Sequence, residues 1–364
     1  MNIIKLKTFN LLMYFCITTF VCNYVFGKEQ RDYSNLIYSK KEHSIWLPIT
    51  YSITGTMDVI QNPYWFSQHN YSEKVKEVWN RIKDPHNNIK KDGGYNKFFK
   101  DEFLSSRVLP NIGLHFLGGA YDTRWLTEYY SHYNYPAPKL FAFLTTYIAH
   151  LGNEALETTS DEISSHDHIA DLYFFDLAAF FAASYDPFMR YLVDDLGMKA
   201  WHFNPMYDID SGDFFNSGLN YIFRPKKLYF ANNKIKPLYF LGMQTLAGAS
   251  YNYTSDEQVT MAAGISLTNP LEQKGRFVTM LAHEKMNTLE ASLFINGSED
   301  FRWRLNLYEK ILERFDYFKN KTSVYNFGLT IGQTKGPAYA FGLNVSLPFG
   351  LGFIKNTRNK RFFE

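Results

Sequence analysis

The side chains best suited to chemistry gather in one part of the chain, between residues 115 and 176. His115 stands in an apolar run, Glu154 and Glu157 follow a second apolar run, and Asp167 and Asp171 begin a third. Residues three or four apart share one face of a helix, so each carboxylate pair points in one direction. If the helices pack as a bundle, one site is expected to contain His115, Glu154, Glu157, Asp167 and Asp171.

Such a site must compensate its charge, because carboxylates cannot be buried fully ionised without partners. They must share protons, hold a metal ion or pair with a nearby basic side chain, for which the sequence offers Arg107, Arg124 and Lys139. A hard divalent cation such as Ca²⁺ or Mg²⁺ would suit the oxygen ligands. In an enzyme, Glu154 or Asp171 would act as general base and His115 as acid or base.

The same residues also have purely structural interpretations. His115 on an apolar face is typical of a core histidine, the two glutamates near a helix end could be solvated, and Ser164 or Ser165 would cap the helix that follows. His166 and His168 should point apart, which argues against a zinc site made by both. The sequence contains no G-x-S-x-G, H-E-x-x-H, P-loop or Gly-rich dinucleotide motif.

The three-helix arrangement of these residues resembles the VanZ-like family and related uncharacterised bacterial envelope proteins. The resemblance covers residues 115–180 and rests on His115, Glu154 with Glu157, and Asp167 with Asp171. It departs from the family where Glu157 replaces the usual Gln, where the loop lacks an Arg, and where Ala178-Ala179 replaces a Gly. The resemblance implies a polar helical site in an envelope protein and no particular activity.

Apolar periodicity predicts the helices that position these residues. They are expected from about Pro110 through Gly119, over Lys139–Thr158, over Asp167–Ser184 and from Asp186 to Leu196, where Gly197 ends the last one. Their apolar cores are too short to cross a bilayer. Upstream, the pattern predicts a helix over Ser72–Ile82, strand-like pieces at 46–49 and 51–54, and a surface loop over 84–95.

Beyond residue 213 the apolar period changes to two, which is typical of strands. Phe301, Trp303, Leu305 and Leu307 alternate with polar neighbours, and similar runs recur up to Phe353, with Glu309–Asp316 as helix or loop. Several runs approach the length of tilted membrane strands. The pattern predicts an antiparallel β-barrel of about eight strands and of the membrane type. A soluble β-sandwich or lipocalin-like barrel is the alternative.

The N-terminus has the pattern of an export signal. Lys5 and Lys7 precede an apolar run over 11–21, and cleavage is expected after Gly27, with an uncleaved anchor as the alternative. Both cysteines lie in this segment, so the cleaved chain would form no disulfide. A net charge of +2 argues against a nucleic-acid partner, and 18% aromatic residues fit a membrane barrel or a sugar-binding surface.

We therefore expect an α+β protein with a signal peptide (1–27), a mixed segment (28–106), a helical unit (107–200), the antiparallel β-barrel (213–353) and a charged tail (354–364). The expected function is that of an outer-membrane-associated protein that is structural or binds a lipid or envelope component through its polar helical site. The alternatives are an envelope hydrolase or transferase, and a soluble secreted or periplasmic binding protein.

Overall fold

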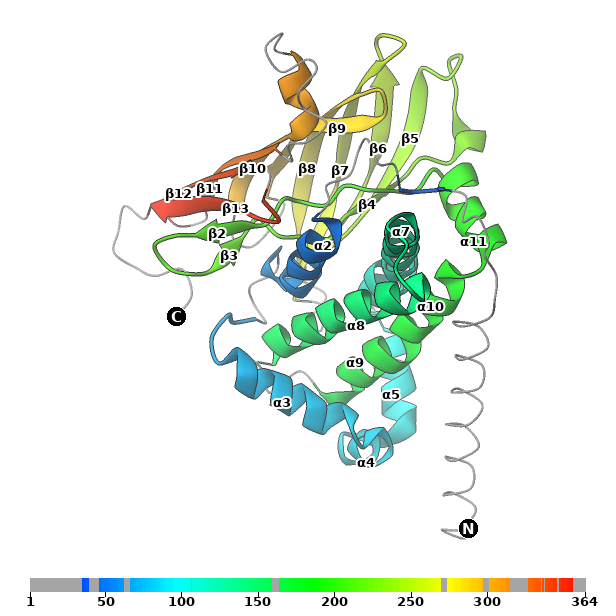
Figure 1. Cartoon of the computed structure of the whole chain (residues 1–364), viewed down its shortest axis with the longest axis vertical. Helices are drawn as coiled ribbons and strands as arrows, with labels where there is room; N and C mark the ends of the chain where they lie inside the picture. The colour runs from blue at the N-terminus through cyan, green and yellow to red at the C-terminus, as the bar shows by residue number, and fades with distance from the viewer. Residues whose placement is uncertain are drawn as a thin grey trace.

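The computed structural model describes residues 35–38, 46–61, 66–105, 107–158, 164–269, 274–296, 301–314, 327–334, 336, 338–345 and 347–355. The expected signal peptide and most of the charged tail lie outside the described residues. Helices form the first half of the described chain and one large sheet forms the second, so the predicted α+β class is confirmed (Figure 1). The helices lie below the sheet in this view.

The helical half runs from residue 47 to residue 195. Its elements are α2 (Leu47–Thr56), η1 (Asp58–Gln61), α3 (Tyr71–Ile82), α4 (Pro85–Lys91), α5 (Gly94–Phe103), α6 (Val108–Pro110), η3 (Asn111–Gly118), α7 (Gly119–His132), α8 (Pro138–Glu157), α9 (Ser165–Ala170), η4 (Asp171–Phe175), α10 (Asp176–Ala183), α11 (Asp186–Arg190) and η5 (Tyr191–Asp195). The expected helices over 72–82, 139–158, 167–184 and 186–196 are confirmed within two residues at each end. None of the helices in the described ranges combines the length and apolar character that crossing a membrane requires.

The two non-helical predictions in the N-terminal segment are wrong. The expected strand pieces at 46–54 form α2, whose buried Leu47, Tyr51 and Thr54 recur at helical spacing. A Cβ on Gly55 would lie 3.1 Å from the Ala149 Cβ, so α2 packs closely against α8. The expected loop at 84–95 contains α4 and the start of α5, which are separated where Gly93 and Gly94 adopt positive φ.

Within the described residues, the sheet contains thirteen strands in the order β1-β4-β5-β6-β7-β8-β9-β10-β11-β12-β13-β2-β3. They are β1 (Lys199–Ala200), β2 (Met206–Asp208), β3 (Phe214–Phe215), β4 (Tyr221–Phe223), β5 (Ile235–Leu241), β6 (Gln244–Asn252), β7 (Glu257–Asn269), β8 (Lys274–Lys285), β9 (Thr288–Ile295), β10 (Phe301–Tyr308), β11 (Phe327–Thr334), β12 (Tyr339–Val345) and β13 (Gly350–Lys355). The expected helix or loop after β10 is η7 (Glu309–Arg314).

The strand number and the closure of the predicted barrel need correction. The described ladders leave β1 and β3 as two ends of the sheet, which is not closed into a barrel. The pairing of β13 with β2 is parallel, whereas the other ladders between described strands are antiparallel. The added strands β1 to β4 have only two or three residues each, too few for an alternating pattern to reveal.

Residues 196–234, between the helical half and β5, lie partly against the face of the sheet that is buried inside the protein, which we call the inner face. Trp201 and Phe203 pack in one core cluster with Leu246 and Phe294 of the central strands. At Gly342 a Cβ would lie 2.8 Å from the Met206 side chain, so glycine permits this close approach. Met206 belongs to β2, so β2 is the neighbour that approaches the last strands here.

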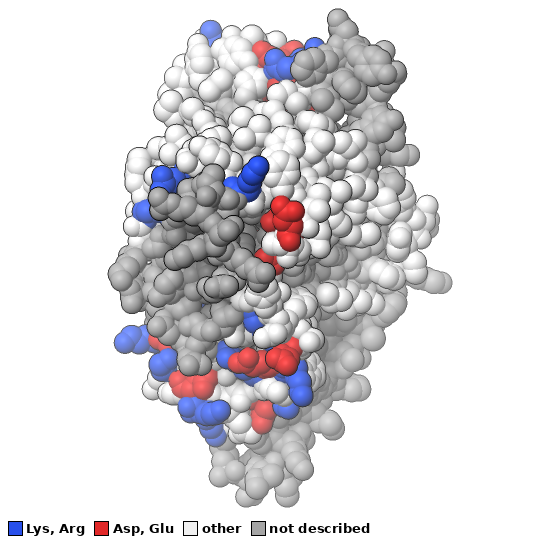
Figure 2. All heavy atoms as spheres, turned by 90° about the vertical axis from the view of Figure 1, so that its left-hand side faces the viewer, with Lys and Arg blue, Asp and Glu red and all other residues white. Residues whose placement is uncertain are grey.

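The outer face of the sheet carries an unbroken apolar row. One outward residue from each of seven adjacent strands pairs with the next across the ladders: Met261, Leu281, Leu293, Leu305, Ile331, Phe341 and Phe353. Each of them is exposed or half-buried, and Met261 is 66% exposed. Figure 2 shows one side of the molecule, where Lys, Arg, Asp and Glu lie near the top and over the lower half, and a few more charged side chains lie between these two groups.

The neighbouring inward row has the opposite character. Its paired residues are all buried, and all are small or polar: Thr260, Ala282, Ser292, Asn306, Thr330, Gly342 and Gly352. A charged pair lies on the same side, where Arg224 Nη1 donates to Glu284 Oε1 at 3.0 Å and Nη2 contacts the second carboxylate oxygen. In these two rows the sheet exposes apolar side chains and buries small or polar ones, whereas other inward side chains, such as Val278, Met280 and Phe294, belong to an apolar core.

Candidate functional site

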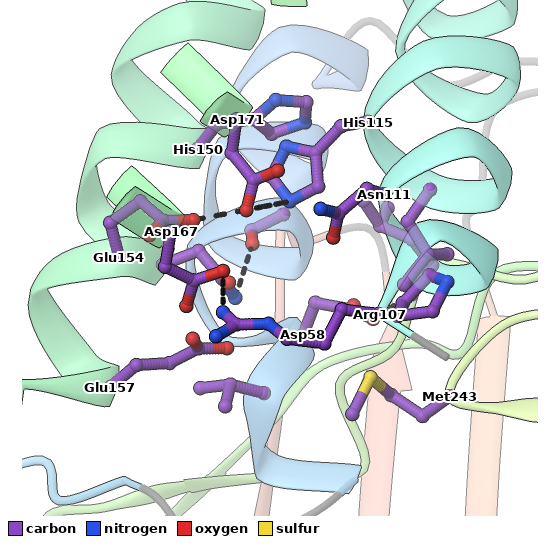
Figure 3. A pocket seen from close by; sticks show the side chains of 16 residues that line it. Asp58, Arg107, Asn111, His115, His150, Glu154, Glu157, Asp167, Asp171 and Met243 are labelled. Carbon is purple, nitrogen blue, oxygen red and sulfur yellow. Dashed lines mark hydrogen bonds and ion pairs between the residues drawn. The ribbon is translucent and has the colours of Figure 1, made fainter. Parts of the chain in front are cut away.

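A cavity of about 100 Å³ opens between α2, η3, α8 and the start of η4. The five residues expected to converge all line it, namely His115, Glu154, Glu157, Asp167 and Asp171 (Figure 3). Asp58, Arg107, Asn111, His150 and Asn153 complete much of its polar wall, and Leu114, Leu219 and Met243 supply apolar surface. The helical bundle thus brings together side chains from separate segments of the sequence.

His115 is oriented by Asp176. Its Nδ1 lies 3.1 Å from Asp176 Oδ1, and His150 Nδ1 lies 2.7 Å from the same oxygen. An ionised carboxylate only accepts hydrogen bonds, so each ring donates its Nδ1–H. The second nitrogen of His115, Nε2, is then directed to Asp171 Oδ2 at 3.6 Å and Glu154 Oε1 at 3.9 Å.

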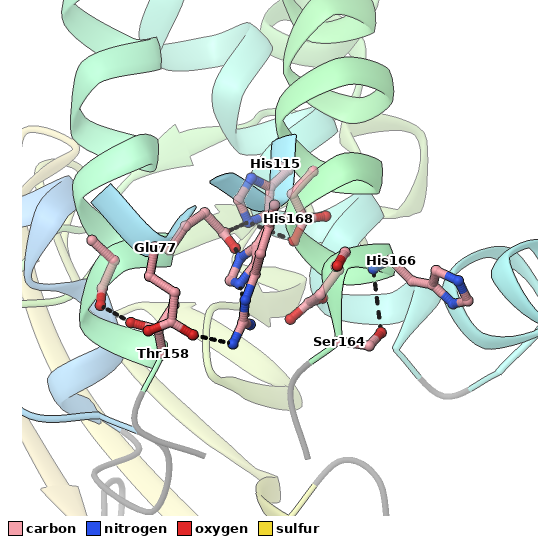
Figure 4. A network of polar contacts seen from close by, with 12 residues as sticks. Glu77, His115, Thr158, Ser164, His166 and His168 are labelled. Carbon is pink, nitrogen blue, oxygen red and sulfur yellow. Dashed lines mark hydrogen bonds and ion pairs between the residues drawn. The ribbon is translucent and has the colours of Figure 1, made fainter. Parts of the chain in front are cut away.

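Glu154 is held from its other side by His168, which is labelled in Figure 4. His168 Nδ1 lies 2.5 Å from Glu154 Oε2, and Arg81 Nη1 lies 2.9 Å from His168 Nε2. Arginine can only donate, so His168 Nε2 accepts and Nδ1 carries the proton that binds Glu154. His166 points away, to the Ile89 carbonyl oxygen at 3.2 Å, so the two histidines diverge as expected.

Arg107 neutralises the other end of the cavity. Its guanidinium contacts the Asp167 carboxylate, and Nε lies 3.4 Å from Glu102 Oε2. Of the basic partners expected from the sequence, Arg107 therefore serves the site. Arg124 instead binds Glu128 at 2.7 Å and Asp186 at 2.5 Å.

The carboxyl groups of the site have pKa values shifted in opposite directions. Burial would raise the pKa of Glu154, but the hydrogen bond and charge of His168 outweigh it, and the pKa is lowered. Burial raises the pKa of Asp171 well above its usual value. Burial and the charge of Glu154 raise the pKa of Glu157 to about 8. Ionised and protonated carboxyls therefore coexist at neutral pH.

The pKa values of His115 and Asp176 are shifted in the directions that favour an ion pair between them. Burial disfavours the imidazolium of His115, but Asp171, Asp176 and Glu154 outweigh burial, and the pKa of His115 is raised well above its usual value. Burial would likewise raise the pKa of Asp176, but His150 and His115 lower it. The site can thus hold a proton on His115 Nε2 and direct it into the cavity.

Two of the site segments are π-helical. His115 lies in η3, and η4 begins at Asp171. Such segments are frequent at functional sites. In η4 the i→i+5 hydrogen bonding widens the turn, which brings Asp171 and Asp176, five residues apart, to the same histidine.

The five residues expected to share the site did not include Asp58, His150 and Asp176, although Asp176 ends the stretch in which the candidate side chains gather. His150 is four residues before Glu154, and that spacing on a helix was a usable signal. Asp58 follows a segment predicted as strand, and the i, i+5 relation of Asp176 to Asp171 does not fit α-helical spacing. Placing Asp58 and Asp176 in the site therefore required knowledge of the local backbone conformation.

Comparisons with known proteins do not assign this site. No family model matches the chain, and searches of curated protein sequences and of solved structures found no match.

Proposed function

We propose that the protein is associated with the outer membrane, contacts lipid through the outer face of its sheet, and binds a lipid or another envelope component beside its polar helical site. The apolar outward row across β7 to β13 is the observation that carries the proposal. A sheet that faces water is expected to alternate in the opposite sense, with polar side chains outside. An apolar exterior and a polar interior are typical of membrane strands.

A second cavity supports the binding of an apolar ligand. It has a volume of about 430 Å³ and lies between the helical unit and the inner face of the sheet. Its wall includes the aromatic side chains of Trp125, Trp201, Phe203, Tyr308 and Phe327. Ligand cavities are commonly lined in this way, by apolar and aromatic groups with a few polar ones. An acyl chain has the matching chemistry.

Fractionation of cells that produce the full chain tests the membrane assignment. The protein should sediment with membranes, resist extraction by alkaline carbonate and require detergent for solubility. Recovery from the soluble periplasmic or secreted fraction without detergent would contradict the lipid contact and favour the soluble binding protein.

Native mass spectrometry tests the bound ligand. The purified protein should carry a lipid mass, and Leu289→Trp, which adds volume at the wall of the second cavity, should reduce it. Thr254→Trp in the exposed turn before β7 is the matched control and should retain it. Equal lipid content in both variants would place the lipid elsewhere.

An envelope hydrolase or transferase is the second candidate. It is favoured by His115, which Asp176 orients toward two carboxyls of opposed pKa shift. Such opposed pairs commonly divide the roles of acid and base. Extracted envelope lipids and cell-wall fragments incubated with the protein should lose or exchange a group, as followed by mass spectrometry. Glu154→Gln should abolish the change, whereas an unchanged substrate pool with the native chain would count against catalysis.

A further inference from the structure

Three ligand atoms of two types face one another in the polar cavity. His115 Nε2, a Glu154 oxygen and an Asp171 oxygen all lie within 4.8 Å of one another. The contacts of Nε2 at 3.6 and 3.9 Å exceed hydrogen-bond length, so a proton there would form no short bond to either carboxylate. The three groups surround a common point without bonding to each other.

Asp171 gives independent support for a ligand at this point. The residue is only 4% exposed, and its Oδ1 is a buried oxygen for which the described part of the chain provides no hydrogen-bond donor. A buried acceptor without a partner is costly. Asp171 also lines the cavity, and its other oxygen, Oδ2, faces His115 Nε2, so a cation contacted by both carboxylate oxygens would satisfy Oδ1.

The surrounding contacts match those that orient metal ligands. A metal-binding histidine commonly donates its second ring N–H to a carboxylate. His115 does so through Nδ1 to Asp176 at 3.1 Å. Glu154 is held at Oε2 by His168, which leaves Oε1 directed to the common point. These outer contacts fix both ligands in advance.

From this geometry we propose that His115, Glu154 and Asp171 bind one divalent transition-metal ion, such as Zn²⁺ or Mn²⁺. Bonds of about 2.0–2.1 Å hold neighbouring ligands roughly 3 Å apart, so binding requires the 3.6 and 3.9 Å separations from His115 Nε2 to contract by about 0.6 and 0.9 Å. The imidazole nitrogen distinguishes this site from the all-oxygen sites of Ca²⁺ and Mg²⁺, which the carboxylates alone had suggested.

The site holds one ion. Two other groups of ligand atoms also lie within 4.8 Å of one another. In the first, from His115, His150 and Asp176, the Asp176 oxygen already accepts from both rings. The second comes from Glu154, Glu157 and Asp167. The guanidinium of Arg107 already contacts Asp167 and supplies the positive charge there. Glu157 therefore lines the same cavity without serving as a ligand, and it offers a matched control. The inference goes beyond the proposed lipid contact and does not depend on it.

Equilibrium dialysis of the full, detergent-purified chain, stripped with chelator and titrated with Zn²⁺ or Mn²⁺, tests the site. About one equivalent should bind, and Mg²⁺ and Ca²⁺ should bind at least about tenfold more weakly. Asp171→Asn and His115→Gln should lower Zn²⁺ affinity by more than about tenfold, and Asp176→Asn by about 10- to 100-fold. Glu157→Gln should change it less than about threefold.

Pulsed electron paramagnetic resonance of the Mn²⁺-loaded native chain keeps the test independent of variant folding. It should resolve the ¹⁴N coupling of one directly bound imidazole. Binding below about a tenth of an equivalent, no ¹⁴N coupling, or equal losses in Asp171→Asn and Glu157→Gln would each overturn the proposal. Membrane fractionation is unaffected by these outcomes, so the two proposals can fail separately.

Discussion

The effect of the substitution Met261→Arg on stability distinguishes a sheet that faces lipid from a sheet that faces water. Met261 lies in the outward row of β7, between the outward residues Val259 and Ile265 and beside Leu281 of β8. Its side chain is 66% exposed, so the protein itself makes few contacts that the substitution would remove. In water, such a surface change alters the free energy of unfolding by no more than about 0.5 kcal/mol.

In a bilayer the same substitution has a much larger effect. An arginine on the lipid face near the midplane costs about 2–4 kcal/mol, whereas near the interface the cost approaches zero. The expected loss of unfolding free energy at the midplane corresponds to a roughly 30- to 700-fold change in the unfolding equilibrium constant. Ser255→Arg, in the exposed turn that precedes β7, introduces the same side chain outside the apolar row and should leave stability almost unchanged.

The assay is urea unfolding of the protein reconstituted into phosphatidylcholine vesicles, followed by tryptophan fluorescence. Met261→Arg should shift the midpoint to lower urea at unchanged slope, while Ser255→Arg should match the native chain. A Met261→Arg protein as stable as Ser255→Arg would refute the lipid contact, because no desolvation of the guanidinium would then have occurred.

Two further predictions concern buried charges. Burial raises the pKa of Asp58 from 3.8 to about 6, so between these pH values the folded state holds a proton that the unfolded chain releases. The free energy of unfolding should therefore fall by about 3 kcal/mol as the pH rises from 3.8 to 6. Asp58→Asn keeps the oxygen that accepts from Leu219 N–H and should flatten this pH dependence, as measured by urea unfolding at a series of pH values. If the variant's stability changed with pH as much as that of the native chain, Asp58 would not be the group responsible. Arg224→Met should destabilise the protein by about 3–5 kcal/mol because it leaves Glu284 buried and unpaired, and Glu284→Met in the same chain should recover most of the loss in a double-mutant cycle. Additive losses would show that the two side chains do not interact.

Local patterns in the sequence determined which segments form helices and strands where those segments are long. The helical spacing in α3 and α8 and the period of two in β7 to β13 reflect one face buried against the protein, and this information is contained in neighbouring residues. The same spacing paired Glu154 with Glu157 and Asp167 with Asp171 before any contact was known.

Only the tertiary structure decided how these segments meet. Strands β1 to β4 are too short to carry a period, and partners distant in the sequence add them to the sheet. The i, i+5 relation of Asp171 to Asp176 depends on a π-helical segment, and the cavity depends on the packing of α2, η3 and α8. A periodic pattern records which side of a segment is buried, whereas the identity of the partner depends on contacts between residues far apart in the chain.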